Sequence, residues 1–361
     1  IEAEQALENA LYISDKYTIS EPFSIEAGVR YSFFSYLGAR TINTYLPGVP
    51  LTESTQTGST KYNSGAFIKT YHAPEFRIAA RYVFMNDMSI KASINTQRQY
   101  IQVLSNTTAI APTDIWKLSD PNIKPQSGIQ YSLGLYKNFN QGMYETSLEV
   151  YYKRMSGFLD YKSGATLVLN KHIETDVVST KGKAYGVELL LKKTTGKLNG
   201  WISYSYSRTL LQMNDSSLGD PVNKGAFYPA NYDKPHDVTI AANYRISHRY
   251  SFSWNATYST GRPITLPIGR FDYAGGGRTL YADRNGHRIP DYFRMDFAIT
   301  LDGNHKVNQT FHNSFTFGAY NLTGQKNPYS VYYISERGAI NGYKLSIFGS
   351  IIPYLNYNIR F

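Results

Sequence analysis

The segment HDVTIAANYRISHRYSFSWNATYS, residues 236–259, decides how this chain folds. Its large apolar side chains occupy every second position on both sides of a short polar turn near 247–249. The alternating positions are Val238, Ile240, Ala242 and Tyr244, and then Phe252, Trp254, Ala256 and Tyr258. Side chains alternate between the two faces of a strand, whereas helical neighbours recur after three or four residues. The segment therefore predicts an antiparallel hairpin with one apolar and one polar face.

The same alternation continues to the last residue of the sequence. In SIIPYLNYNIRF, residues 350–361, one face would carry Leu355, Tyr357, Ile359 and Phe361. The other face would carry Tyr354, Asn356, Asn358 and Arg360. Chain termini usually fray unless they are tied into a sheet. We therefore expect the final strand, including its last aromatic residue, to have a role of its own.

Alternating segments of this kind occur about 13 times, and the connections between them are alternately short turns and long polar loops. Long connections in a compact soluble domain count against a strand assignment, but outer-membrane barrels have them on the extracellular side. The sequence thus predicts an all-β, transmembrane antiparallel β-barrel that forms a single domain over residues 1–361. The expected extracellular loops lie near 38–73, 105–126, 160–182, 213–235, 260–290 and 323–351.

The composition excludes some other classes. No stretch approaches the roughly 18 apolar residues of a membrane helix, and the mean hydropathy is -0.39. The chain has no Cys, so it has neither disulfides nor thiolate metal sites. Its net charge of +10 is compatible with anionic lipid or acidic ligands, but it is dispersed rather than gathered in one basic run. We expect no nucleic-acid partner.

The polar face of the strands carries charges of both signs. We expect these side chains to line an enclosed, polar lumen and to contact whatever fills it, although the surface of a β-sandwich is the competing interpretation. The predicted lumen-facing residues are Glu26, Arg30, Glu145, Glu149, Glu188, Arg245, Arg294, Asp296 and Arg360. Aromatic residues, which make up 15% of the chain, cluster near the segment ends of the apolar face, as in membrane-interface girdles.

Several segments, taken in order, resemble a known family. They are AGVRYSFF (27–34), WKLSDPNIKPQSG (116–128), AYGVELLLKK (184–193), YPANYDKPHDVTIAANY (228–244), TGRPIT (260–265), GHRIPDYFRMDF (286–297) and GAYNLTGQKNPYSVYY (318–333). Together with the closing YLNYNIRF, they resemble the C-terminal barrel portion of a TonB-dependent outer-membrane receptor of the Bacteroidetes type. No single segment is specific, but their joint order and spacing are.

The resemblance implies that this chain supplies the C-terminal strands, about 13, of a 22-stranded barrel and lacks the plug domain. It also implies a location in the outer membrane. The implied partners are outer-membrane lipid, the plug and the remaining strands, a TonB-type energising protein and the outer-membrane assembly machinery. Leu355, Tyr357, Ile359 and Phe361 resemble the terminal signal that this machinery reads. The chain could be a fragment, or another chain could complete the barrel.

The implied function is uptake of a scarce or large nutrient by displacement of the plug. Two alternatives remain open: a passive porin or structural barrel component, and a secreted carbohydrate-binding β-protein. We find no catalytic cluster, no metal-ligand spacing and no sign of a cofactor, and DRNGHR (283–288) is interpreted as a turn. Candidate ligand contacts in the loops are Tyr45, Trp116, Lys124, Tyr228, Tyr232, Arg278 and Tyr281.

Overall fold

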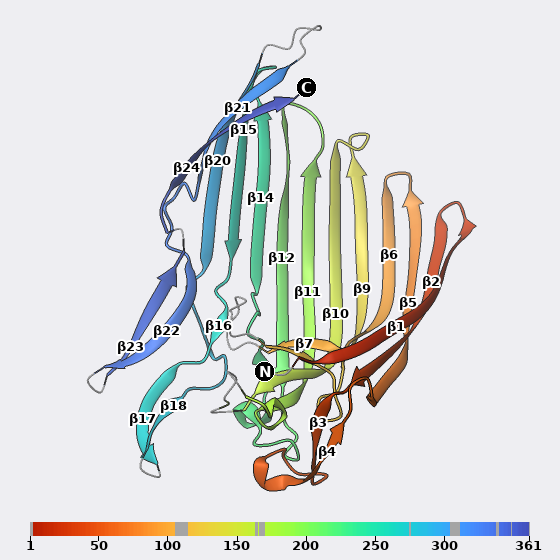
Figure 1. Cartoon of the computed structure of the whole chain (residues 1–361). Coiled ribbons are helices and arrows are strands. Elements are labelled where there is room, and N and C mark those ends of the chain that lie inside the picture. Colours follow the sequence, from red (N-terminus) through yellow and green to blue (C-terminus); the bar gives the residue numbers. More distant parts are fainter. Residues whose placement is uncertain are drawn as a thin grey trace.

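One large, strongly curved antiparallel sheet makes up most of the molecule (Figure 1). The computed structural model describes residues 3–104, 115–162, 165, 170–273, 276–303, 311–336, 339–347 and 349–360. The main path of the 14-stranded sheet is β1-β2-β5-β6-β9-β10-β11-β12-β14-β15-β20-β21-β24, and β13 pairs with β12 beside it. The all-β prediction with about 13 wall strands is confirmed.

The strands of this sheet follow one another along the chain. They are β1 (Gln5–Ser20), β2 (Phe23–Leu37), β5 (Phe67–Met85), β6 (Met88–Gln99), β9 (Gln126–Phe139), β10 (Tyr144–Tyr161), β11 (Val177–Lys193), β12 (Leu198–Gln212), β13 (Tyr228–Pro229), β14 (His236–Arg245), β15 (Tyr250–Ser259), β20 (Tyr292–Asp302), β21 (His312–Tyr320) and β24 (Ile352–Arg360). Within the described residues, β1 and β24 are the two edges of the sheet, which is therefore open.

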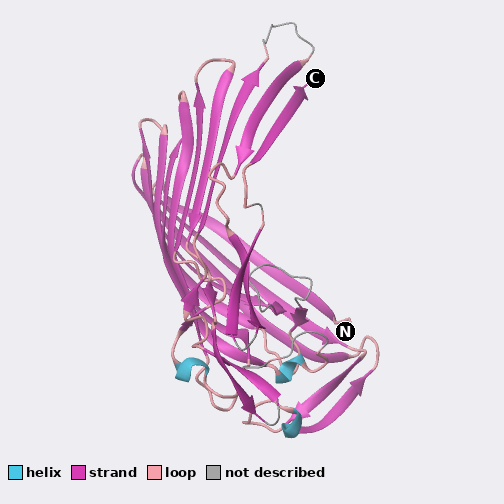
Figure 2. Ribbon diagram, turned by 90° about the vertical axis from the view of Figure 1, so that its left-hand side faces the viewer, coloured by secondary structure: helices cyan, strands magenta, loops and turns pink. Residues whose placement is uncertain are grey.

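All of the long connections leave the same end of the sheet, which we call the loop end (Figures 1 and 2). They contain small two-stranded sheets and three short 3-10 helices. The paired strands are β3 (Arg40–Tyr45) with β4 (Gln56–Tyr62), β7 (Ile101–Leu104) with β8 (Ile115–Leu118), β16 (Pro263–Ile264) with β19 (His287–Arg288), β17 (Pro267–Tyr273) with β18 (Gly276–Tyr281), and β22 (Pro328–Glu336) with β23 (Ala339–Ser346). The helices are η1 (Glu53–Thr55), η2 (Ile173–Thr175) and η3 (Val222–Gly225).

Short turns join the strands at the opposite end, which we call the turn end. The turn between β9 and β10 shows why the sequence allows it. Asn140, Gln141 and Gly142 have φ angles of 53°, 57° and 86°, and Asn and Gly tolerate this left-handed region best. At the loop end, by contrast, β5 begins at Phe67 and β10 continues to Tyr161, so the strands reach further into the ranges 38–73 and 160–182 than the sequence predicts.

The strand registers divide the wall into two faces. Glu149 on β10 lies opposite Gly134 on β9 and Glu188 on β11. Glu188 lies opposite Ser205 on β12, which in turn faces Asp237 on β14. We call this the inner face, because loop residues fold over it. Alternate residues such as Val150 and Leu133 form the outer face, and these two are 39% and 45% exposed.

Buried apolar clusters are found at the loop end of the described chain. One groups Leu104, Ile123, Ile173 and Val177, a second groups Phe34, Tyr36 and Tyr100, and a third groups Leu211, Tyr228 and Ala230. Each cluster joins the end of a wall strand to a connection that folds back over it. The packed interior of the molecule therefore lies beyond the wall, among the loops.

Candidate functional site: the inner face and its loop end

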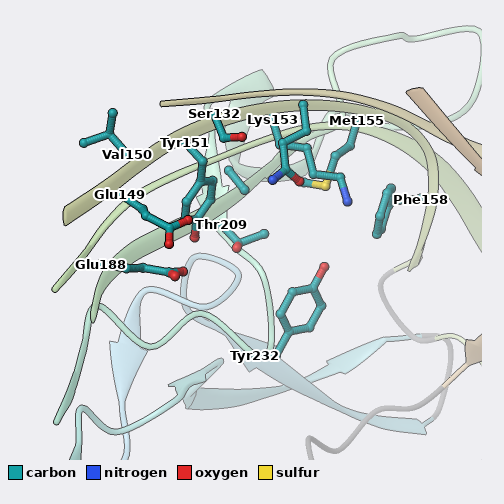
Figure 3. A pocket seen from close by; sticks show the side chains of 12 residues that line it. Ser132, Glu149, Val150, Tyr151, Lys153, Met155, Phe158, Glu188, Thr209 and Tyr232 are labelled. Carbon is teal, nitrogen blue, oxygen red and sulfur yellow. The ribbon is translucent and has the colours of Figure 1, made fainter. Parts of the chain in front are cut away.

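A polar cavity of about 430 Å³ lies against the inner face of β9 to β12 (Figure 3). Glu149 and Glu188 line it from neighbouring strands, and Lys153 lines it nearer the loop end. Tyr232, from the connection between β13 and β14, lines the cavity on the side opposite the strands. Val150 points away from the cavity in Figure 3, as strand alternation requires. The wall and a loop thus border an open space that carries acidic groups.

The two glutamates of this cavity are directly opposite each other across the β10–β11 ladder. Like charges in that position destabilise a strand pair. Neither carboxylate forms a salt bridge with another described residue, whereas nearby Glu145 does, with its Oε2 2.9 Å from Nζ of Lys192. The arrangement favours an occupant that brings positive charge to Glu149 and Glu188.

All nine predicted lumen-facing residues lie on the inner face, as the continuous registers show. Glu26 and Arg30 are on β2, Glu145 and Glu149 on β10, Glu188 on β11, Arg245 on β14, Arg294 and Asp296 on β20, and Arg360 on β24. Some form ion pairs within the wall. Arg294 Nε is 2.8 Å from Asp296 Oδ1, and Arg30 Nη2 is 3.6 Å from Glu8 Oε1.

At the loop end of β1 and β2, a buried charge network holds β8 and the residues that follow it against the wall. Lys117 Nζ donates to Glu4 Oε1 at 2.6 Å and to Asp120 Oδ2 at 2.5 Å. Tyr36, which is completely buried, donates its hydroxyl to the same Glu4 at 3.1 Å. The other oxygen of Asp120 accepts the backbone N–H groups of Asn122 and Ile123, both at 2.8 Å. Every charge in this network has a partner, as burial requires.

A second network fixes the connections above β10 and β12. Asp160 accepts the Tyr228 hydroxyl at 2.5 Å and an Arg284 Nη1–H at 2.8 Å. Asp233, which is 2% exposed, accepts the backbone N–H of Thr209 at 2.6 Å and is paired with Arg288. DRNGHR forms the predicted turn, in which the Gly286 N–H donates to the Asp283 carbonyl at 3.1 Å. Two arginines of that turn segment therefore bind two different buried aspartates.

Burial and hydrogen bonds shift the pKa values of groups at the loop end. Desolvation, with Asp160 as the next cause, raises the pKa of the Tyr228 phenol far above its usual value. Desolvation and Glu174, whose carboxylate accepts the Tyr45 hydroxyl at 2.9 Å, raise the pKa of Tyr45 to about 12. The pKa of Asp291 is lowered because its carboxylate accepts hydrogen bonds from the Tyr258 hydroxyl and the Gly261 N–H. These tyrosines remain neutral donors, and Asp291 remains an anion, at neutral pH.

The predicted ligand-contact residues have different surroundings. Tyr228 is 1% exposed and Tyr45 is bonded to Glu174, so both hydroxyls already hold loops together. Trp116 on β8, Tyr232 in the cavity wall and Tyr281 on β18 are 58%, 55% and 55% exposed. Lys124 and Arg278 are exposed as well. The structure brings Tyr232 to the inner-face cavity, and we keep the others as predicted contacts of the loop end.

The predicted terminal signal lies on the outer face of β24. Leu355, Tyr357 and Ile359 are 70%, 48% and 48% exposed and alternate with the inner-face residues of the same strand. Phe361 lies outside the described residues.

Sequence reasoning missed the buried aspartates Asp120, Asp160 and Asp233. Asp120 precedes Pro121 and Asn122, and an Asp in such a context commonly bonds the backbone two residues on, so this one could have been found. Asp160 binds Arg284, which is 124 residues away in the sequence, and Asp233 binds Arg208 and Arg288, which are 25 and 55 residues away, so no local signal marks either aspartate.

Other kinds of site are not seen in the ranges that the structure describes. No group of three His, Asp or Glu side chains there could hold a metal ion. No helix of the described chain is long and apolar enough to cross a membrane.

Comparison with known proteins shows which family the strands of the wall belong to. The family model described as "TonB dependent receptor-like, beta-barrel" matches residues 3–322. No curated protein matches the sequence. Among solved structures, the ferric yersiniabactin uptake receptor FyuA from Yersinia pestis has a TM-score of 0.59 at 15% identity and covers 99% of this chain and 46% of its own.

Two further receptors show the same fold. The ferric citrate transporter FecA, in the unliganded form, has a TM-score of 0.58 at 14% identity, with 98% of this chain and 45% of its own covered. The ferric-catecholate import receptor Fiu from E. coli K12, in its closed form, has a TM-score of 0.54 at 14% identity, with 99% and 45% covered. The chain thus spans less than half the length of these receptors.

The Bacteroidetes type suggested by the sequence is not confirmed by these matches, which come from other bacteria where an organism is named. The family assignment itself rests on most of the wall, from β1 to β21. This chain belongs to the TonB-dependent receptor β-barrel family.

Proposed function

We propose that this chain forms part of the wall of an outer-membrane receptor that takes up a scarce or large nutrient when an energising TonB-type protein displaces a plug. The observation that carries the proposal is the division of the wall into an apolar, exposed outer face and a charged inner face. A soluble sheet would bury its apolar face against a second layer. Here Leu133, Leu148 and Leu189 are 45%, 40% and 43% exposed.

Hydrocarbon is the environment that such an outer face fits. Each residue advances a strand by about 3.4 Å, so the apolar rows from Leu191 to Tyr185 on β11 extend over roughly 20 Å along the strand. This is comparable with the apolar band of about 25 Å on outer-membrane barrels. The exposed outer face of β24 extends the band to the other edge of the sheet, where the assembly machinery would read Leu355, Tyr357 and Ile359.

The inner face supports the role of a plug. Glu149 and Glu188 face each other without a cationic partner among the described residues, and they line a cavity that the wall does not fill. A plug that brings Lys or Arg side chains to this cavity would neutralise both carboxylates. Such a plug, like the remaining strands, could belong to the same chain or to another chain.

Fractionation of cells that make the full-length protein tests the location. We expect it in the dense outer-membrane fraction and in detergent extracts. Recovery from the soluble periplasm would instead support a secreted β-protein.

Ion conductance in planar bilayers tests the plug. With the inner-face occupant in place, the wild-type protein should conduct little, whereas Glu149→Gln with Glu188→Gln should loosen the occupant and raise conductance. Glu145→Gln is the matched control, because Glu145 already has Lys192 as its partner. High conductance of the wild-type protein would favour a passive porin.

A further inference from the structure

Four cationic side chains gather on the outer face at the loop end of β6, β10 and β11. They are Arg98, Arg154, Lys181 and Lys183, which we call the basic patch. Arg154 lies directly opposite Lys183 across the β10–β11 ladder. Arg98 is opposite Ser127, Ser127 is opposite Ser156, and Ser156 is opposite Lys181, so these residues form the next row of the same face. The patch therefore spans neighbouring strands although its members are far apart in the sequence.

The four side chains border a surface groove of about 750 Å³. Most of its other lining residues also belong to the outer face, among them Phe76, Ile129 and Tyr152. Arg98, Arg154 and Lys181 are exposed, and Lys183 is half-buried. The groove thus joins apolar rings to accessible positive charges.

No salt bridge links any of the four cations to a carboxylate of the described chain. Lys183 Nζ lies 4.1 Å from the centroid of the Phe227 ring, and the Arg154 guanidinium lies 5.8 Å from that of Tyr152. Hydrogen bonds from the Ser217 hydroxyl and N–H lower the pKa of the Asp215 carboxyl, and the charge of Lys181 adds to this shift without a salt bridge between the two. Glu75, which also lines the groove, accepts the Ser32 hydroxyl on the inner face.

Some other cationic side chains at the loop end, unlike those of the basic patch, are paired with carboxylates. Arg208 and Arg288 share Asp233, and Arg284 is paired with Asp160. Unpaired positive charges placed side by side repel one another by Coulomb's law. The basic patch therefore gathers four like charges around one groove, and none of the four has a salt-bridge partner in the described chain.

The position of the patch relative to the apolar band indicates what supplies the counter-charge. The row next to Arg154 and Lys183 on the outer face consists of Tyr131, Tyr152 and Tyr185, and the row after it of Leu133, Val150 and Val187. Adjacent rows are separated by two residues, or about 7 Å. Tyrosine marks the level at which hydrocarbon gives way to headgroups, so the patch lies at headgroup height on the loop side.

We propose that the basic patch binds the phosphate groups of an anionic glycolipid of the surrounding leaflet, whose acyl chains lie along the apolar rows beneath. Arginine and lysine are the side chains that bind phosphate best, arginine through a planar fork and lysine as a point charge. A soluble anion would use the cations but not the adjoining exposed rings. This inference rests on the membrane placement proposed above and is independent of transport.

Native mass spectrometry of the detergent-purified full-length protein tests the site. The probes are diphosphorylated lipid A, the same glycolipid without phosphates, and inorganic pyrophosphate. Each cation near an anionic lipid contributes about 1 kcal/mol, which is about fivefold in affinity. We therefore expect Arg154→Gln with Lys183→Gln to bind diphosphorylated lipid A roughly 25-fold more weakly.

The matched control removes two outer-face cations from the opposite end of the wall. Lys137 and Lys193 lie at the turn end of β9 and β11, so Lys137→Gln with Lys193→Gln should leave binding unchanged. Equal loss in this control, equally tight binding of the phosphate-free glycolipid, or displacement by equimolar pyrophosphate would overturn the proposal.

A salt series on the wild-type protein covers the case in which the double variant does not fold. Binding to lipid A should weaken as ionic strength rises, because exposed charges are screened, and salt-independent binding contradicts the proposal. A protein that is recovered from the soluble fraction defeats the membrane placement itself. If the protein is embedded in the membrane but binds the phosphate-free glycolipid as tightly as diphosphorylated lipid A, only this inference is contradicted.

Discussion

In the wall, the large apolar side chains face outward, and Leu133 and Leu148 are 45% and 40% exposed. At the loop end the relation is reversed, since Tyr36 and Tyr228 are 0% and 1% exposed and lie in apolar clusters. Two pairs of carboxylates show a similar contrast, although other wall charges, such as Arg294 and Asp296, are paired. Glu149 and Glu188 on the wall have no salt-bridge partner in the described chain, whereas Asp160 and Asp233 at the loop end are each paired with arginine.

In the membrane placement proposed above, this difference reflects two solvents, hydrocarbon around the wall and water around the loop end. The wall would then place its polar face inside and its apolar face against hydrocarbon, and it would need no buried core of its own. The loop end is built as a small soluble domain is, with apolar clusters and paired buried charges. These clusters and ion pairs hold the described connections over the inner face.

The largest effect is expected at the loop end. Asp233→Ala leaves Arg208 and Arg288 without their carboxylate and Thr209 N–H without its acceptor. Breaking a buried ion pair costs about 3–5 kcal/mol. Urea unfolding of the full-length protein in detergent would measure the loss, and Asp233→Asn, which keeps an acceptor oxygen, should cost less. If Asp233→Ala lowered the free energy of unfolding by less than the wall variants do, the loop end would not be a stabilising core.

A charge placed on the wall should have a smaller effect that depends on the face. Val150→Arg puts a cation on the outer face within the apolar band and should cost about 2–4 kcal/mol in a bilayer. Ser205→Arg, on the inner face between Glu188 and Asp237, should be neutral or slightly stabilising. Folding into lipid vesicles, followed by gel mobility without heating, gives both values. Equal costs on the two faces would remove the distinction between them.

The smallest effect concerns the Tyr45 hydroxyl, which joins β3 to Glu174. Its pKa is raised to about 12, against about 10 for a free tyrosine. The folded state therefore favours the neutral phenol, and this stabilisation is complete below pH 10 and is lost between pH 10 and 12. The absorbance titration of the wild type minus that of Tyr45→Phe should show this late step. A midpoint near the ordinary value would mean that the hydroxyl is not buried.

The wall could be predicted from the sequence because its signal is local. Alternation in 236–259 fixes a hairpin and its faces, and β14 and β15 have the register that it implies. The same rule placed Glu26, Arg245 and Arg360 on one face without any knowledge of their neighbours. A period-two pattern assigns the faces of a strand from that strand alone.

The loop end could not be predicted in the same way, since its contacts join distant segments. Asp160 binds Arg284, and Tyr45 binds Glu174. Tyr228 was expected as a possible ligand contact because aromatic loop residues often have that role, but the structure shows its ring buried against the β12 end. The basic patch could not be predicted either, because its cations are far apart in the sequence and come together only through the register of neighbouring strands.

The two edges of the sheet have one more consequence. β1 begins at the loop end, where Gln5 faces Leu37, and β24 also begins there, where Ile352 faces Tyr320. The two edge strands, β1 and β24, thus run in the same direction, so they cannot pair with each other in an antiparallel ladder. Any set of strands that seals the gap must be odd in number. Added to the 13 along the main path, it makes an even total, in agreement with the parity of single-chain bacterial barrels.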